Sequence, residues 1–134
     1  MNECIFCKIV KGEIPCYKVY EDEGFFGFLD IKPLNKGNCL LIPKKHFRWV
    51  DDVEAFGAYW EAAKKISTAT KKAFGSITTS YLTLGFEVLH AHIRIVPRYE
   101  NDGHDDGIQI SNVKDISKEE MTEIAEKIRL NLNS

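Results

Sequence analysis

The 134-residue chain lacks any marked excess of charge of one sign. It carries 18 Lys and Arg against 20 Asp and Glu, which gives a formal net charge of −2 at pH 7, and its pI is about 6.1. Proteins that hold nucleic acid polymers by their phosphates need clustered, excess Lys and Arg. The charge balance therefore argues against broad electrostatic binding to DNA or RNA.

The chain also lacks an apolar run of the roughly 20 residues that a membrane-spanning helix requires. Its first residues, which include Glu3 and Cys4, do not have the character of a secretory signal peptide. We therefore expect a cytoplasmic protein without a membrane partner. In that compartment the four Cys are expected to be thiols or metal ligands and not disulfides.

Internal repeats, low-complexity tracts and linker-like stretches are absent as well. A hydrophobic content of 44% with 28% charged residues is typical of a globular chain. A chain of this length can form one substantial core but not two ordinary domains. We predict a single domain over residues 1–134.

The spacing of apolar residues predicts the secondary structure. Apolar runs bounded by turn residues indicate strands at residues 17–20, 25–30, 38–42 and 80–84. Residues 56–74 follow helical spacing, with Asp51 or Asp52 available as the cap and Gly75 at the end. A capping box at residues 117–120 begins a last helix. Strands grouped around helices without βαβ alternation predict an α+β fold, with an antiparallel sheet of about five strands, one long central helix and a C-terminal helix.

The stretch from Leu89 to Ile95 has the clearest pattern. Every second residue is apolar, which predicts a half-buried strand, and His90, His92 and Arg94 fall on the opposite face. Neighbours on one face of a strand lie about 6.6 to 6.8 Å apart, so a phosphate group can touch two of them. The alternative is a polar outer face that happens to contain two His.

This stretch resembles the signature of the histidine triad (HIT) superfamily of nucleotidyl hydrolases and transferases, with Arg94 in place of the third His. Three upstream blocks resemble the same family in the same order. They are residues 4–15, residues 28–33, and residues 41–46 after Gly37. The resemblance implies a HIT-like fold, and a homodimer whose sheet continues across the interface.

The resemblance implies that His90, His92 and Arg94 form the catalytic set, with His92 as the nucleophile. A neutral imidazole can attack the α-phosphorus of a nucleotide and form a nucleotidyl-histidine. Arg94 can grip phosphate oxygens with its planar fork, but Arg is a poor proton donor near pH 7. We therefore expect binding to be intact and turnover to be slowed for leaving groups that need a proton.

Nucleotide binding is assigned through the same resemblance. Asp30 matches the acidic residue that accepts hydrogen bonds from ribose hydroxyls, and Phe6, Leu29 and Ile31 match the slot that flanks the base. The alternatives are a turn-forming Asp and ordinary core residues. Because Leu29 alternates with Phe28, at most one of these two is expected to face the base.

The pair Cys4-x-x-Cys7 is a weak signal alone, compatible with a redox pair or with two incidental buried thiols. In prokaryotic HIT proteins the same pair commonly binds zinc with two His that match His46 and His90, so the resemblance implies a closed structural zinc site of Cys4, Cys7, His46 and His90. Cys16 and Cys39 are expected to be core thiols. The acidic stretch 100–107 is expected to be a loop with His104 solvated. Phe86 stands where many members have Gln, and Glu87 receives no role.

Together these features predict a hydrolase of small nucleotide conjugates, purine nucleoside phosphoramidates or dinucleotides, with structural zinc and no organic cofactor. Its partners are expected to be a small-molecule nucleotide and a second copy of the chain. Two alternatives remain open. One is a nucleotide-binding or sensing module whose turnover is impaired by Arg94, and the other is a zinc-stabilised interaction protein in which His92 is unused.

Overall fold

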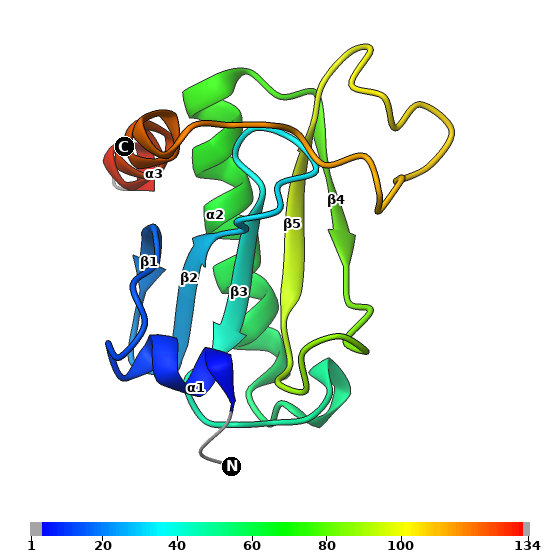
Figure 1. The fold of residues 1–134 in the computed structure, drawn as a ribbon. Coiled ribbons are helices and arrows are strands. Elements are labelled where there is room, and N and C mark those ends of the chain that lie inside the picture. The colour runs from blue at the N-terminus through cyan, green and yellow to red at the C-terminus, as the bar shows by residue number, and fades with distance from the viewer. Residues whose placement is uncertain (1–3, 133–134) are drawn as a thin grey trace.

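The computed structural model describes residues 4–132. The first residues, on which the expectation about a signal peptide rests in part, and the two ends of the predicted 1–134 domain lie outside this range. The described chain forms one five-stranded antiparallel sheet in the order β1-β2-β3-β5-β4 (Figure 1). The strands are β1 (Lys18–Glu21), β2 (Phe25–Leu29), β3 (Cys39–Pro43), β4 (Thr78–Leu82) and β5 (Ile93–Arg98). The predicted α+β class and antiparallel sheet are confirmed.

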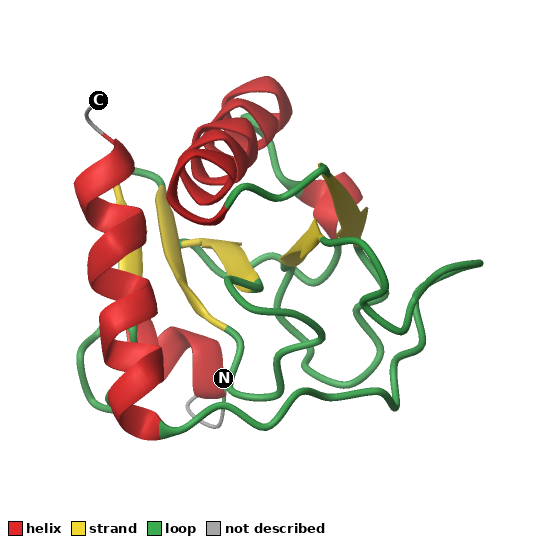
Figure 2. Ribbon diagram, turned by 90° about the horizontal axis from the view of Figure 1, so that it is seen from above, coloured by secondary structure: helices red, strands yellow, loops and turns green. Residues whose placement is uncertain are grey.

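Helices cover the sheet on both faces. The long helix α2 (Phe56–Phe74) and the C-terminal helix α3 (Lys118–Leu132) pack on one face, and the short helix α1 (Ile5–Val10) lies on the other (Figures 1 and 2). A 3-10 turn, Val50–Asp52, precedes α2. Both α1 and this turn were missed in the sequence. None of the described helices is both long and apolar enough to cross a bilayer.

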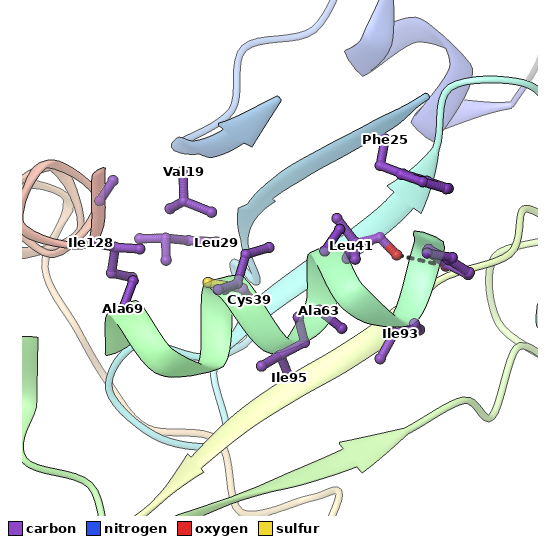
Figure 3. Close-up of a cluster of buried hydrophobic side chains, with 14 of the residues drawn as sticks. Val19, Phe25, Leu29, Cys39, Leu41, Ala63, Ala69, Ile93, Ile95 and Ile128 are labelled. Carbon is purple, nitrogen blue, oxygen red and sulfur yellow. Dashed lines mark hydrogen bonds between the residues drawn. The ribbon is translucent and has the colours of Figure 1, made fainter. Parts of the chain in front are cut away.

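The larger core lies between the sheet and helices α2 and α3. It joins alternate residues of neighbouring strands to the buried side of the helices, as Leu29, Leu41 and Ile128 illustrate (Figure 3). The Tyr59 hydroxyl donates a hydrogen bond of 2.8 Å to the carbonyl oxygen of Leu41. This bond satisfies the one polar atom that the aromatic side chain brings into the core.

The second, smaller core lies under α1 on the opposite face of the sheet. It joins Phe6 and Ile9 of α1 to Phe26, Phe28, Leu40 and Ile42 of β2 and β3. Because both faces of the central strands are covered, β2 and β3 are apolar at every position and buried throughout.

Three capping residues at helix ends were predicted from the sequence, and the structure confirms two of them. Gly75 ends α2 in the left-handed conformation, φ 70°, which glycine adopts without steric cost. The Ser117 hydroxyl accepts a hydrogen bond of 3.1 Å from the backbone N–H of Glu120, as expected of a cap. The expected N-terminal cap of α2 is wrong, because Asp51 and Asp52 belong to the preceding 3-10 turn and Ala55 stands at the cap position.

The predicted strand from Leu89 to Ile95 is shorter than its pattern indicated. β5 begins at Ile93, and the residues before it form an irregular segment held by a 2.7 Å hydrogen bond from the Ala91 N–H to the Phe47 carbonyl. Leu89 is 57% exposed, so its assignment to the buried face is wrong. His90 and His92 are buried instead, because α1 covers the face on which they stand.

The acidic stretch 100–107 is a loop, but His104 within it is not solvated as predicted. His104 is fully buried, and its two ring nitrogens contact the Leu34 carbonyl at 3.0 Å and the Gln109 N–H at 2.9 Å. Asp102 is also buried and pairs with Arg98 at 2.8 Å. Asp102 fixes the loop by accepting further hydrogen bonds from the Asn35 side chain and from the backbone of Tyr99 and His104.

Asp102→Asn is expected to reduce the free energy of unfolding by about 3 to 5 kcal/mol, the usual cost of leaving a buried charge without its partner. The Arg98 guanidinium is the main cause that holds the pKa of Asp102 far below its usual range. A depressed carboxyl pKa stabilises the fold above the unfolded pKa of about 3.9, and this stabilisation is lost as the pH falls below it.

Urea unfolding of the wild type and the variant, measured from pH 7 to pH 3, checks this expectation. The difference between the two proteins should shrink below about pH 4. Asp106→Asn is the matched control, because Asp106 is exposed in the same loop and surface changes usually stay within about 0.5 kcal/mol. Equal midpoints for the wild type and Asp102→Asn at pH 7 would contradict the expectation.

Candidate functional site

The residues singled out in the sequence meet at the end of the sheet beneath α1. His92 and Arg94 come from the start of β5, Asp30 follows β2, and Phe6 comes from α1. They line a pocket of about 270 Å³. The other residues that line it are Ile5, Ile31, Lys32, Leu40, Glu87 and Val88.

A second, more apolar pocket of about 340 Å³ adjoins the first. The two share Ile5, Phe6, Asp30, Ile31 and Leu40 along their linings. The second pocket continues along α1 and the segment before β1, with Ile9, Ile14, Pro15, Cys16 and Tyr17 as lining residues. The site therefore has a charged end at His92 and Arg94, an apolar end, and Asp30 between them.

His92 is buried, and its orientation is fixed by a backbone carbonyl. Its Nδ1 lies 2.8 Å from the carbonyl oxygen of His90. A carbonyl can only accept, so Nδ1 carries the proton and Nε2 keeps its lone pair. Burial lowers the pKa of His92, and the positive charge of Arg94 lowers it further. The imidazole is therefore neutral at pH 7 and able to act as a nucleophile.

Arg94 forms an ion pair with Asp30 across the pocket. Its Nη2 donates to Asp30 Oδ2 at 3.1 Å, and both side chains are largely buried. The other carboxylate oxygen, Oδ1, accepts a hydrogen bond of 2.9 Å from the backbone N–H of Lys32. Arg94 Nε is buried and makes no hydrogen bond within the described residues. Each carboxylate oxygen retains acceptor capacity, because a carboxylate offers about four lone-pair sites.

The aromatic side of the site differs from the sequence assignment in one residue. The Phe6 ring meets the His92 ring edge-on at 5.3 Å and the Phe28 ring at 5.6 Å. Leu29 lines the apolar pocket, but its side chain belongs to the main core on the opposite face of the sheet (Figure 3). Ile31 lines both pockets and is 76% exposed. The alternation of Leu29 with Phe28 places the two side chains on opposite faces, and Phe28 is the one that lies on the face of Phe6 and lines the apolar pocket.

The four predicted metal ligands also come together. The Sγ atoms of Cys4 and Cys7 and the ring nitrogens of His46 and His90 all lie within 4.8 Å of one another. Cys4 Sγ lies 3.3 Å from His90 Nδ1, Cys7 Sγ lies 3.3 Å from His46 Nδ1, and Cys7 Sγ lies 3.5 Å from His90 Nδ1. Tetrahedral zinc with ordinary bond lengths separates its ligand atoms by about 3.3 to 3.8 Å. The donor set and its spacing therefore fit a zinc ion.

His90 is held in the tautomer that a metal ligand needs. Its Nε2 lies 2.8 Å from the carbonyl oxygen of Pro43, so Nε2 carries the proton and Nδ1 presents a lone pair to the two sulfurs. Burial is the main cause that lowers the pKa of His90 to about 4. The Phe6 ring meets the His90 ring edge-on at 5.8 Å, so α1 touches both this cluster and His92.

The remaining predicted residues lie outside the metal cluster. Cys39 is fully buried in the main core, as expected of a core thiol. Cys16 is half-buried at the edge of the smaller core and lines the apolar pocket. Phe86 is 79% exposed and packs edge-on against Trp49 at 5.3 Å. Glu87, which had no predicted role, lines the charged pocket beside His92 and Arg94.

Comparison with known proteins gives one consistent result. A family model described as the HIT domain matches residues 11–101. The adenylylsulfatase HINT3 of Arabidopsis thaliana is 39% identical over 108 residues, which cover 75% of this chain and 55% of that protein.

Two solved structures have nearly the same fold. A hypothetical histidine triad nucleotide-binding protein, ST2152 of Sulfolobus tokodaii, superposes with a TM-score of 0.82 at 32% identity over 97% of this chain and 92% of the other. A zinc-bound histidine triad family protein from Mycobacterium smegmatis superposes with a TM-score of 0.81 at 28% identity over 98% and 94% of the two chains. Because the family model spans more than half of the sequence and the fold agrees throughout, this chain belongs to the HIT domain family.

Proposed function

We propose that the protein is a nucleotidyl hydrolase or transferase that acts on the α-phosphate of small nucleotide conjugates. Purine nucleoside phosphoramidates and dinucleotides are the proposed substrates. The observation that carries this proposal is the orientation of His92, whose Nδ1–H is held by the His90 carbonyl at 2.8 Å while the residue lines the charged pocket. The adenylylsulfatase activity named for the Arabidopsis relative supports nucleotide hydrolysis in this family.

The reaction proceeds in two steps through a covalent intermediate. In the first step the Nε2 lone pair of His92 forms a bond to the α-phosphorus, and the leaving group departs with the electron pair of its own bond to phosphorus. In the second step water attacks the same phosphorus and gives up a proton to the solvent, while the electrons of the P–N bond return to Nε2. The Nδ1–H of His92 keeps its hydrogen bond to the His90 carbonyl in both steps. This hydrogen bond stabilises the positive charge that develops on the ring.

The nucleotide occupies both pockets, with the ribose between them. Asp30 accepts hydrogen bonds from the two ribose hydroxyls through the acceptor sites that Lys32 N–H and Arg94 leave open. The base lies in the apolar pocket against Phe6 and Phe28, and Ile31 covers its outer side. The α-phosphate then lies at the charged end, beside His92 and the guanidinium of Arg94.

Zinc is the proposed structural ion, held by Cys4, Cys7, His46 and His90. A zinc-bound structure within the family supports this assignment. A closed set of four protein ligands provides no open position for a substrate, so the ion contributes stability and not chemistry. The four residues connect α1, the segment after β3 and the segment before β5. Phe6 is thereby held against His92.

Intact-mass spectrometry tests the covalent step directly. The protein is mixed with adenosine 5′-phosphosulfate and quenched in the millisecond to second range, because the nucleotidyl-histidine forms before water opens it. We expect a species heavier than the protein by one AMP group and its absence in His92→Asn. An adduct that persists in His92→Asn, or AMP release without any adduct at the shortest quench times, would contradict the proposed intermediate.

A second candidate function is nucleotide binding or sensing with little turnover. The observation that favours it is the presence of Arg94 at a position where a proton donor is expected, because Arg binds phosphate well and donates protons poorly. Tight AMP binding by calorimetry, together with no release of product from any conjugate, would support this candidate over the hydrolase.

The homodimer and the cytoplasmic location stay predictions. The edge strand β4 is the proposed dimer contact, because it bears the exposed side chain of Tyr81 and follows directly after the exposed Ile77. The other edge strand, β1, packs against α3. A sedimentation mass equal to one chain at micromolar concentration would contradict the dimer.

A further inference from the structure

We propose that this site selects conjugates whose leaving group departs as a stable anion, and that it is a poor catalyst for phosphoramidates. The selected substrates are mixed anhydrides of a nucleoside monophosphate with a sulfate, carboxylate or phosphate group. This inference rests on the proposed nucleotidyl transfer to His92 and narrows its substrate class. The residue that carries it is Arg94.

Arg94 is placed to bind the α-phosphate and to remain charged. It lies two residues from His92 along the chain and lines the same pocket. Its Nη2 is occupied by Asp30 at 3.1 Å, whereas its buried Nε has no partner among the described residues. A buried N–H donor without a partner is costly, and a phosphate oxygen that reaches the guanidinium edge can relieve that cost. The guanidinium thus links ribose recognition at Asp30 with phosphate recognition at His92.

The two substrate classes differ in the proton that the leaving group requires. When His92 attacks a mixed anhydride, the P–O bond breaks and its electron pair departs on an oxygen that is stable as an anion. That step needs no proton donor. When His92 attacks a phosphoramidate, the P–N bond breaks and the nitrogen must gain a proton to leave as a neutral amine. Arg94 cannot supply this proton, because a guanidinium is not deprotonated near neutral pH.

Two other titratable groups of the pocket, His92 and Asp30, are poorly suited to replace that donor. The Nδ1–H of His92 is occupied by the His90 carbonyl, and the Asp30 carboxylate is ion-paired with Arg94. Lys32 and Glu87 are exposed at the rim of the pocket. Glu87 is the rival to be tested, because its charge also acts on His92. A carboxylate there would serve better as an acceptor of the proton from the attacking water in the second step.

The test compares two substrates that share one nucleotide. The specificity constant kcat/KM is measured for adenosine 5′-phosphosulfate, a mixed anhydride, and for adenosine 5′-phosphoramidate, with AMP release as the common readout. We expect the wild type to favour the anhydride by at least about 100-fold, the lower range of what general acid catalysis contributes. A preference below about tenfold, which corresponds to less than about 1.4 kcal/mol, would overturn the inference.

Two substitutions at Arg94 separate proton donation from the loss of charge. Arg94→His introduces a proton donor and is expected to raise kcat/KM for the phosphoramidate by more than about tenfold. Arg94→Gln removes the charge without adding a donor near pH 7, and it is expected not to raise that constant. An equal increase in both variants, or none in Arg94→His, would overturn the inference.

Glu87→Gln tests the rival donor. If the wild type hydrolyses the phosphoramidate efficiently and Glu87→Gln selectively loses that activity, Glu87 supplies the proton and the inference is wrong. Release of AMP from both substrates with no preference overturns the inference alone and leaves the proposed function standing. Release of AMP from neither substrate overturns the proposed function, and the inference falls with it.

Discussion

His92→Asn is expected to lower the turnover number by about four orders of magnitude or more, the usual scale when a covalent nucleophile is removed. Asn has no nitrogen lone pair that can attack phosphorus, but its amide can still donate to the His90 carbonyl, which His92 Nδ1 contacts at 2.8 Å. The local structure should therefore survive while the chemistry is lost. Steady-state release of AMP from adenosine 5′-phosphosulfate is the measurement.

Binding is the control that separates chemistry from folding in this variant. His92→Asn should bind AMP with a dissociation constant close to that of the wild type, because Asp30, Phe6 and Phe28 provide most of the proposed contacts. Its unfolding midpoint in urea should also change little. A rate loss of less than about 100-fold, with binding intact, would show that another group attacks the phosphorus.

The residues of the charged end were predictable because their spacing of two places their side chains on one face of a strand. Two His that alternate with apolar residues ahead of Arg94 predicted one charged end of a site. The structure brings His92 and Arg94 into one pocket, whereas His90, which was predicted both as a catalytic residue and as a metal ligand, lies in the metal cluster and does not line that pocket. The Cys-x-x-Cys pair was ambiguous alone. Only the resemblance connected it to His46 and His90, residues more than 35 positions away that the fold brings within 4.8 Å of the sulfurs.

The sequence did not predict that a helix covers the second face of the sheet and buries His90 and His92 there. A period of two predicts which residues share a face, but not whether that face meets solvent or another element. The helix α1 is only six residues long, too short for its periodicity to be recognised, and it covers the His face. For the same reason the pattern left open which of Leu29 and Phe28 faces the site, since the ring that selects Phe28 is that of Phe6 in α1.

His104 illustrates a second kind of failure. It stands in a stretch of Asp, Asn and Gly, and such composition predicts a solvated loop. The loop instead closes over buried polar groups, and the ring of His104 satisfies the Leu34 carbonyl and the Gln109 N–H at once. No local sequence pattern predicts the contact between His104 and Leu34, which are 70 positions apart in the chain.

Removal of zinc is expected to lower both the stability of the fold and the affinity of the site. If the free ion is present at about 1,000 times its dissociation constant, it stabilises the fold by about 4 kcal/mol. Loss of that amount should lower the melting temperature by about 8 to 16 °C for a chain of this size. Calorimetry with and without a strong chelator, together with elemental analysis of the purified protein, measures both quantities.

The double variant Cys4→Ser/Cys7→Ser should lose the ion and melt at the temperature of the chelated wild type. Cys16→Ser is the matched control, since this thiol lies outside the cluster and should retain one zinc per chain. The consequence extends to the site, because Phe6, in the same short helix as Cys7, packs on His92 at 5.3 Å. A rise in KM for nucleotide conjugates should accompany the loss of zinc. Equal zinc content in both variants would show that these four residues do not form the metal site.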